Sequence, residues 1–451
     1  MTNHRAISKF LVLTALSLLI IAAGGCKKKE KVDLVIVSPH NKKIQAEFEN
    51  AFRRWYKSNY GIDVNIEWRD VGGTTSITRF LVSQYTRTDS SGIDLYFGGG
   101  APDHKFLAEK GITVRVVLPP QLLEKIPAVI GGIRQYDPAG RWYGAAMSCF
   151  GIIYNAKLLR ANNLPIPRTW DDLASPAMYN RIAAADATQS GSARAAYEMI
   201  VQSSPSWQAG WAKLLKIFGN CKRFTSSASD IPTDVANGEI LAGAAIDFYA
   251  YDQIAVSGKD LGFTIVRGAT AFTPDPISML RGAPHAQIAN RFIEFVLSEQ
   301  GQCLWCLPPG EPMGPERYAL YRQPVRRDVY EKYADKMLKP LVNPFTYSGD
   351  FKFDESKAAI RISRLWAPLM KAAAIDSAAQ LHKAWKVIID SGQPADLLKE
   401  FSRLPDDLAD EQTALKTAEK LTDPKQRELI TSKWQRFFRD KYNRIISRQG
   451  K

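Results

Sequence analysis

The fold is decided first by the stretch VDLVIVSPHN at residues 32–41. It opens with an unbroken apolar run of strand length, which ends in a loop of small and polar residues. From Asn41 the pattern changes to helical spacing, with an apolar stripe over residues 44–55 and Gly61 where a helix commonly ends. This stretch therefore predicts a strand, a polar loop and a helix, in that order.

The same order of elements follows twice more. Strands are predicted at residues 62–68 and 93–97, and each leads into a glycine-rich loop, at residues 72–75 and 98–100, before a helix. Three such units in succession indicate a parallel sheet covered by helices. Because the ligands of these sheets bind beyond the carboxyl ends of the strands, the three loops are expected to lie at one binding edge.

A second region of the same kind runs over residues 144–262. Its clearest unit is an apolar strand at residues 182–185, which is followed by a polar turn at 186–192 and a helix. Beyond it, a strand and an amphipathic helix indicate a return to the first region. The sequence thus predicts an α/β fold of two lobes, with lobe I made of residues 32–143 and 263–322 and lobe II made of residues 144–262.

The remaining residues, 323–451, are predicted to form a mainly helical C-terminal extension. Its last helix, at about residues 424–446, has apolar side chains at helical spacing and basic side chains elsewhere. A helix of this kind could bind a membrane surface. We expect it instead to dock on lobe II and to leave its basic face in solvent.

The N-terminus has the pattern of an export signal, predicted over residues 1–25. A basic start precedes an apolar run at residues 10–23, which is shorter than the about 20 residues that a membrane span needs. The run ends at Gly24-Gly25-Cys26, which indicates a bacterial lipobox. We expect Cys26 to carry a lipid, residues 26–31 to form a tether, and the protein to be a membrane-anchored lipoprotein of the periplasm or cell surface.

Composition and charge narrow the class of partner. The chain has 451 residues, of which 45% are hydrophobic and 24% charged, as expected for a globular protein of two or three domains. Its formal net charge is +14. In an exported protein this balance favours an anionic ligand or a membrane surface, and we expect no nucleic acid partner.

Four cysteines remain when Cys26 is set aside: Cys149, Cys221, Cys303 and Cys306. The last two have CxxC spacing, but no second pair of zinc ligands follows them, and they close a predicted helix where a redox motif would open one. We interpret them as a local disulfide or as free core thiols.

Two predicted helix starts carry residues that suit an anion site. The backbone N–H groups at a helix start point at whatever lies there, and the helix dipole favours negative charge. An ordinary helix cap needs the same residue types. Because these two starts lie at strand ends of opposing lobes, a ligand between them would be held from both sides. The residues expected to bind it are Gly73, Thr74, Thr75, Thr188, Ser190, Gly191 and Ser192.

Further candidates follow other strands. Ser38 and His40 lie in the loop after the first strand, and His40 could bind either the ligand or a metal ion. Asp247, Tyr249 and Tyr251 follow a strand of small residues, where a phenol could donate to an anion or, as a phenolate, bind ferric iron. His40, Tyr249 and Tyr251 would be metal ligands only if the solute were ferric ion.

We find no catalytic motif in the sequence. Ser190 does not belong to a GxSxG motif because Thr188 occupies the first glycine position, and no HExxH motif occurs. None of the five histidines has a catalytic partner indicated by a motif. We therefore expect a protein that is not an enzyme and that needs no cofactor.

The chain resembles the extracellular solute-binding proteins of ABC importers, in the ferric-iron, thiamine and phosphonate-like group with the type II periplasmic-binding fold. The resemblance covers about residues 33–309 and depends on the order and spacing of several pieces. These are VDLVIVSPHN, IDLYFGGG with FLAEKGI, IIYNAKLL with LPIPRTWDDLASP, AADATQSGSA, VANGEILAGAAIDFYAY and IANRFIEFVLSEQGQ.

This resemblance implies a monomer that closes two lobes around a small solute and delivers it to an ABC permease. Iron-binding members carry adjacent tyrosines where this chain has Phe248-Tyr249. We therefore expect an anionic solute (an organophosphate, phosphonate or carboxylate), with ferric ion as the alternative. A ligand-sensing module for a membrane kinase, or a secreted enzyme on the same fold, is the alternative of another class.

Overall fold

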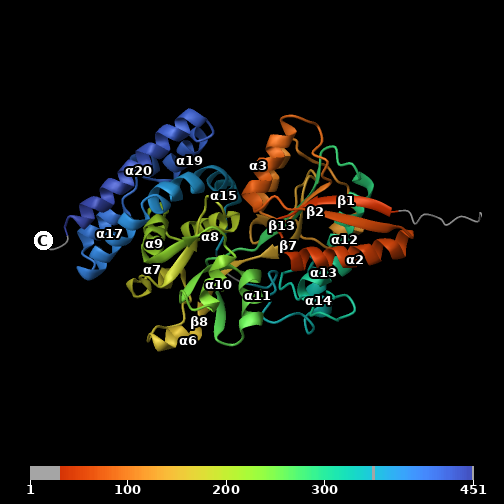
Figure 1. Ribbon diagram of the computed structural model, residues 1–451, viewed down its shortest axis with the longest axis horizontal. Helices are drawn as coiled ribbons and strands as arrows, with labels where there is room; N and C mark the ends of the chain where they lie inside the picture. The colour runs from red at the N-terminus through yellow and green to blue at the C-terminus, as the bar shows by residue number, and fades with distance from the viewer. Residues whose placement is uncertain (1–30, 348–350, 449–451) are drawn as a thin grey trace, which may run out of the picture.

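The computed structural model describes residues 31–347 and 351–448. The predicted signal peptide, residues 1–25, and the predicted lipidation site, Cys26, lie outside the described residues. Two α/β lobes lie side by side, and the C-terminal helices, blue in Figure 1, cover the outer side of one of them. None of the described helices is long and apolar enough to cross a membrane.

Lobe I is a mixed sheet with helices on both faces (Figure 1). Its elements are β1 (Lys31–Val37), α2 (Lys42–Tyr60), β2 (Asp63–Arg69), α3 (Thr74–Tyr85), β3 (Leu95–Phe97), α4 (Ala101–Glu109), β4 (Thr113–Val114), α5 (Pro120–Leu123), β5 (Val129–Ile130), β6 (Ile133–Arg134), β7 (Tyr143–Ser148), β13 (Thr273–Leu280), α12 (Ala286–Leu297), α13 (Glu299–Cys306) and α14 (Arg327–Tyr333). The strand order is β2-β1-β3-β13-β4, and β7 pairs with β13. β1 is parallel to both β2 and β3, with Leu34 opposite Ile66. Because both faces of β1 are covered, it is apolar throughout its centre.

Lobe II has a second mixed sheet, with the order β10-β9-β11-β8-β12. Its elements are β8 (Phe150–Asn155), α6 (Ala156–Ala161), α7 (Trp170–Ala174), β9 (Ile182–Ala185), α8 (Gly191–Gln202), α9 (Trp207–Asn220), β10 (Cys221–Thr225), α10 (Asp230–Ala236), β11 (Ala242–Ile246), α11 (Asp247–Ser257) and β12 (Leu261–Ile265). β9 is parallel to β10 and β11, whereas β8 is antiparallel to β11 and β12. The polar turn predicted after residue 185 therefore lies at the carboxyl end of a central strand.

The chain passes between the two sheets at Cys149 and again between Ile265 and Thr273. The borders expected at residues 143/144 and 262/263 shift to these points because Met147 pairs with Pro274 in the first sheet and Phe263 pairs with Ile153 in the second. A third crossing follows α14, because the C-terminal extension packs on lobe II. With these borders, the division into lobes stays our proposal.

The C-terminal extension is helical and docks on α9 of lobe II (Figure 1). Its elements are α15 (Glu355–Ile360), a π-helical turn (Arg361–Leu365), α16 (Trp366–Met370), a second π-helical turn (Lys371–Ile375), α17 (Ala378–Asp390), α18 (Ala395–Ser402), α19 (Glu411–Lys420) and α20 (Pro424–Ile446). Trp211 of α9 stacks on Trp366, with 5.0 Å between ring centroids. A Cβ placed on Gly219 would lie 2.7 Å from Trp385, so the glycine allows this close approach.

Cysteines in the described part of the chain are free thiols and all four are buried. Cys303 and Cys306 close α13 and pack in a small apolar cluster with Leu307 and Val329. Of the two interpretations of this pair, the structure therefore favours free core thiols.

Candidate functional site

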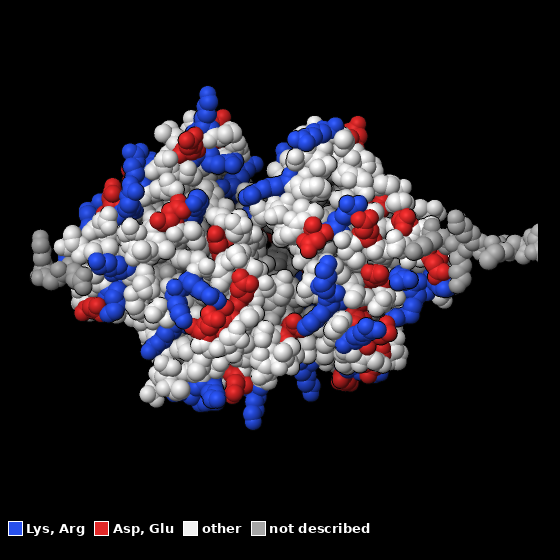
Figure 2. Space-filling view, viewed as in Figure 1, with Lys and Arg blue, Asp and Glu red and all other residues white. Residues whose placement is uncertain are grey.

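Two adjoining cavities lie between the lobes, beneath the groove visible in Figure 2. The inner cavity has a volume of about 140 Å³ and the outer cavity about 580 Å³. The two share one set of lining residues, which come from the loop after β1 and from the first turns of α3, α8 and α11. These residues are Pro39, His40, Thr74, Gly191, Ser192 and Tyr249.

The starts of α3 and α8 face each other across this cleft. α3 begins after Gly73, and α8 begins after Ser190, whose hydroxyl accepts a hydrogen bond from the Ala193 N–H at 3.2 Å. A Cβ placed on Gly191 would lie 3.8 Å from Thr74 Cβ, so the two starts nearly touch. Since the first N–H groups of a helix have no acceptor within it, both helices direct donors into one space.

A buried cluster of charged side chains forms another part of the cavity wall. Asp275 Oδ2 lies 2.8 Å from His40 Nε2 and 2.5 Å from Arg322 Nη1. Arg322 Nη2 donates to Ser148 Oγ at 2.9 Å, and its guanidinium lies 4.1 Å from the ring centre of Phe248. Burial alone would raise the pKa of Asp275, but Arg322 and His40 outweigh it and hold the pKa below its usual value.

Several polar atoms of this cluster have no partner in the part of the chain that the structure describes. They are His40 Nδ1, Asp275 Oδ1 and Arg322 Nε, and all three are buried. Leaving a buried polar atom unpaired costs roughly 1–3 kcal/mol, so such atoms are rarely left so without a reason. Because all three residues line the inner cavity, a polar ligand could satisfy them.

Eight of the twelve residues predicted from the sequence line one or both cavities. They are Ser38, His40, Gly73, Thr74, Ser190, Gly191, Ser192 and Tyr249. The described structure thus brings together the loop after β1 and the two helix starts. Their role in ligand binding stays a prediction, because the geometry shows position alone.

Four predicted residues line neither cavity: Thr75, Thr188, Asp247 and Tyr251. Thr75 Oγ1 instead accepts a hydrogen bond from Arg194 Nη2 at 2.5 Å. Asp247 is fully buried and accepts from the Cys149 N–H at 2.9 Å, while burial raises its pKa to about 6. Its carboxyl group therefore holds the turn between the lobes together.

Tyr249 and Tyr251 do not converge on one metal site. Two residues that are two apart on a helix point to different sides; Tyr249 faces the cavities, whereas Tyr251 packs against Phe263 and Tyr321. Burial raises the pKa of both phenols, which disfavours the phenolate that ferric iron needs. The described residues also contain no group of three His, Cys, Asp or Glu side chains that could hold a metal ion.

Sequence reasoning missed Ser148, Asp275 and Arg322. The sequence around Asp275 did carry a signal, because Pro274 and Pro276 flank it. Prolines within a strand indicate an irregular segment, and the pairing of this strand is indeed shifted there. Arg322 had none, since it lies in a stretch without regular secondary structure. It also missed Asp103 of α4, which lines the inner cavity and whose pKa burial raises against the opposing charge of Arg194.

Comparison with known protein families finds a match to one family. Residues 89–313 match the family described as bacterial extracellular solute-binding protein. The phosphoglycerate transport regulatory protein PgtC of Salmonella typhimurium is 29% identical over 181 residues, which are 40% of this chain and 45% of PgtC. An uncharacterized protein of Haemophilus influenzae is 24% identical over 212 residues, 46% of this chain and 59% of that protein. The chain thus spans about half the length of the curated relatives it matches.

Solved structures confirm the fold class. The periplasmic binding protein AfuA of Actinobacillus pleuropneumoniae, with exogenous fructose-6-phosphate bound, matches with a TM-score of 0.57 at 17% identity, over 78% of this chain and 97% of AfuA. Iron-bound HitA of Pseudomonas aeruginosa matches with a TM-score of 0.55 at 18% identity, over 73% of this chain and 98% of HitA. At such identities the likeness is one of fold, and it confirms the predicted two-lobed α/β architecture.

Proposed function

We propose that this chain, which belongs to the bacterial extracellular solute-binding proteins, captures a small anionic solute between its lobes and delivers it to an ABC permease. One observation carries the sign of the charge: the starts of α3 and α8 face each other across a cleft that also holds the buried Arg322. Helix starts and a guanidinium all favour negative charge. Closure of the lobes would select the bound state.

The solute class that fits is an organophosphate, phosphonate or carboxylate. Phosphate and carboxylate groups accept several hydrogen bonds at once, as paired helix starts require. The name of PgtC refers to phosphoglycerate, and AfuA is described with fructose-6-phosphate bound, so two similar proteins are linked to phosphorylated anions. They support the anionic class and do not identify the solute.

Ferric ion is the alternative solute, and the description of HitA as iron-bound is what favours it. Against it stand the separate positions of Tyr249 and Tyr251 and the engagement of His40 Nε2 with Asp275. Ferric binding should give a tyrosinate-to-iron colour that disappears in Tyr249→Phe. An anionic solute gives no such colour.

A role in sensing is the second candidate of another class, because PgtC is described as a regulatory protein. The same cleft would then report its closed state to a membrane partner such as a kinase. Neighbouring genes distinguish the two roles, since import requires a permease and an ATPase. In either role we propose a monomeric binding protein, exported and held to the membrane by a lipid on Cys26, and mass spectrometry of the mature N-terminus tests that anchor.

The proposed function is tested by ligand-induced stabilisation of the purified protein. The panel is inorganic phosphate, 3-phosphoglycerate, fructose 6-phosphate, phenylphosphonate, citrate and ferric citrate. A ligand at about 100 times its dissociation constant should stabilise the protein by about 2.7 kcal/mol. An anion that stabilises the parent but not Ser190→Asp supports the proposal, and a panel without any stabilising member contradicts it.

A further inference from the structure

Part of the C-terminal extension lines the inner cavity, although it follows both lobes in the sequence. The residues that do so are Phe353, Glu355, Ala358, Ala359 and Ile362. All but Glu355 are apolar, and they meet Ile133, Phe150 and Ala195 from the two lobes around the same cavity. The cavity therefore has an apolar wall in addition to the wall formed by His40, Asp275 and Arg322.

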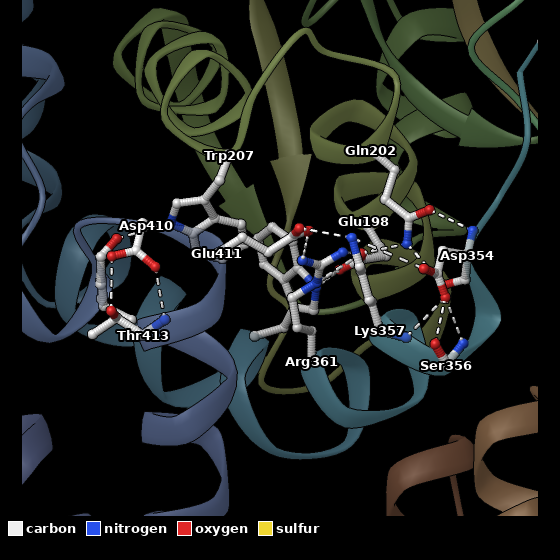
Figure 3. Close-up of polar contacts among 12 residues, drawn as sticks. Glu198, Gln202, Trp207, Asp354, Ser356, Lys357, Arg361, Asp410, Glu411 and Thr413 are labelled. Carbon is white, nitrogen blue, oxygen red and sulfur yellow. Dashed lines mark hydrogen bonds and ion pairs between the residues drawn. The ribbon is translucent and has the colours of Figure 1, made fainter.

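This apolar wall is fixed to lobe II by a dense polar network on α8 (Figure 3). Arg361 Nε donates to Glu198 Oε1 at 2.9 Å, and Arg361 Nη1 lies 2.7 Å from Glu411. Gln202 exchanges two hydrogen bonds with the backbone of Asp354, at 2.7 and 3.1 Å. The same helix therefore begins at the cleft and holds the extension, so the position of the wall is tied to the position of that helix start.

The extension also reaches across the cleft to lobe I. Glu355 Oε1 pairs with Lys105 Nζ at 2.8 Å, and Glu355 Oε2 accepts from the Arg134 N–H at 3.0 Å. Arg194 bridges the same gap, because it donates to the carbonyl of Ile362 at 3.1 Å and to Thr75 of lobe I. With Glu355 neutralised by Lys105, the extension presents no free charge to the cavity among its described lining residues.

We propose that the extension is part of the binding site and that its apolar wall selects an anion with a compact apolar body over a polyhydroxylated anion. This inference rests on the proposed function and names the solute class more narrowly. The anionic group would bind at the helix starts and Arg322, and the apolar body would pack on Ala359 and its neighbours. Apart from Glu355, whose oxygens are engaged by Lys105 and by the Arg134 N–H, the side chains of that wall offer buried hydroxyl groups no hydrogen-bond partner, which costs affinity.

The test compares two anions of different body and one without a body. Phenylphosphonate, fructose 6-phosphate and inorganic phosphate are titrated calorimetrically into the full-length protein and two variants. Ala359→Phe fills the space beside the apolar wall, and Ala359→Ser makes the wall polar with little change in volume. Ser363→Phe is the matched control, because Ser363 is exposed on the next turn and does not line the cavity.

We expect the parent to bind phenylphosphonate at least about tenfold more tightly than fructose 6-phosphate. Ala359→Phe should weaken phenylphosphonate by about tenfold or more and leave inorganic phosphate within about twofold, while Ser363→Phe changes neither. Ala359→Ser should weaken the binding of phenylphosphonate by a smaller factor. This variant tests the inference if Ala359→Phe does not fold. Tighter binding of fructose 6-phosphate, or phenylphosphonate binding that neither Ala359 variant alters, overturns the inference and leaves the proposed function standing. If none of the three anions binds, the inference fails, whereas the proposed function still stands if 3-phosphoglycerate or citrate stabilises the protein.

Discussion

Two buried arginines show how similar clusters can differ in purpose. Arg361 of the extension has its Nε, Nη1 and Nη2 atoms bound to Glu198 or Glu411 (Figure 3). Glu198 also accepts a hydrogen bond from Trp366 Nε1 at 2.7 Å. Arg322 in the cleft has a comparable burial, but its Nε and Asp275 Oδ1 have no partner in the described chain. A complete network fixes an element in place, whereas an incomplete one beside a cavity can still receive a ligand.

The first prediction concerns the complete network and has the largest expected effect. Arg361→Leu leaves the carboxylate of Glu198 buried without its cation, and removing one partner of a buried pair costs about 3–5 kcal/mol. Denaturant unfolding followed by tryptophan fluorescence measures the loss. The matched control is Arg448→Leu, because Arg448 pairs with Asp396 on the surface and should cost at most about 1 kcal/mol. Equal losses in the two variants would remove the distinction between a fixing network and a surface pair.

The second prediction concerns the pH dependence of stability and a buried side chain, His104, that is neutral in the folded protein near neutral pH. His104 hydrogen-bonds Ser278 Oγ at 2.6 Å and the carbonyl oxygen of Gly98 at 3.0 Å, and burial lowers its pKa to about 4. Because the unfolded chain then binds the proton more readily, stability should fall as pH drops from about 6.5 to about 4, by about 3 kcal/mol from this residue.

The pH dependence of the unfolding free energy, measured in the parent and in His104→Gln, checks this prediction. The variant should lose part of the slope between pH 6.5 and pH 4, whatever its stability at neutral pH. Parallel curves for the two proteins would show that His104 is charged or exposed in the folded state.

The third prediction addresses the incomplete cluster directly. Arg322→Lys keeps the charge but loses the planar fork, so the anion should lose a charged hydrogen bond worth roughly 1.5–3 kcal/mol. Affinity for the anion that stabilises the parent most should fall by about ten- to a hundredfold in calorimetric titration.

Its control is Arg326→Lys, since Arg326 binds Asp328 at 2.7 Å nearby and lines neither cavity. This control should alter stability and leave affinity unchanged. If Arg322→Lys also leaves affinity unchanged, the unpaired atoms of the cluster do not receive the ligand.

The smallest expected effect on stability lies at the start of α8. Ser190→Ala removes the cap that accepts from Ala193, and should cost about 1 kcal/mol of stability. Ser190→Asp keeps a cap but sets a fixed negative charge against the bound anion, so it should weaken binding more than Ser190→Ala does. Stronger binding by Ser190→Asp would mean a cationic solute, and parent-like binding by both would place the anion elsewhere.

Local patterns were enough to predict much of the fold and one side of the site. The apolar run of β1 and the helical spacing of α2 depend on neighbours in the chain, as does the cap at Ser190, and all three occur where the sequence predicts them. Asp247 and Tyr251 follow the strand of small residues as the sequence predicts, yet they line neither cavity of the cleft. The direction in which these two side chains point depends on how α11 packs against β8 and β12. The residue types in the turn do not specify that packing.

The sequence by itself therefore determined the two α/β lobes, the helical extension and the polar loops at the strand ends. The tertiary structure alone decided which of those loops meet, because His40, Asp275 and Arg322 approach within hydrogen-bonding distance from positions up to 282 residues apart. It also decided that residues of the extension line the cleft. Secondary structure depends on short-range periodicity, whereas a site between lobes depends on packing between distant segments, which no local pattern records.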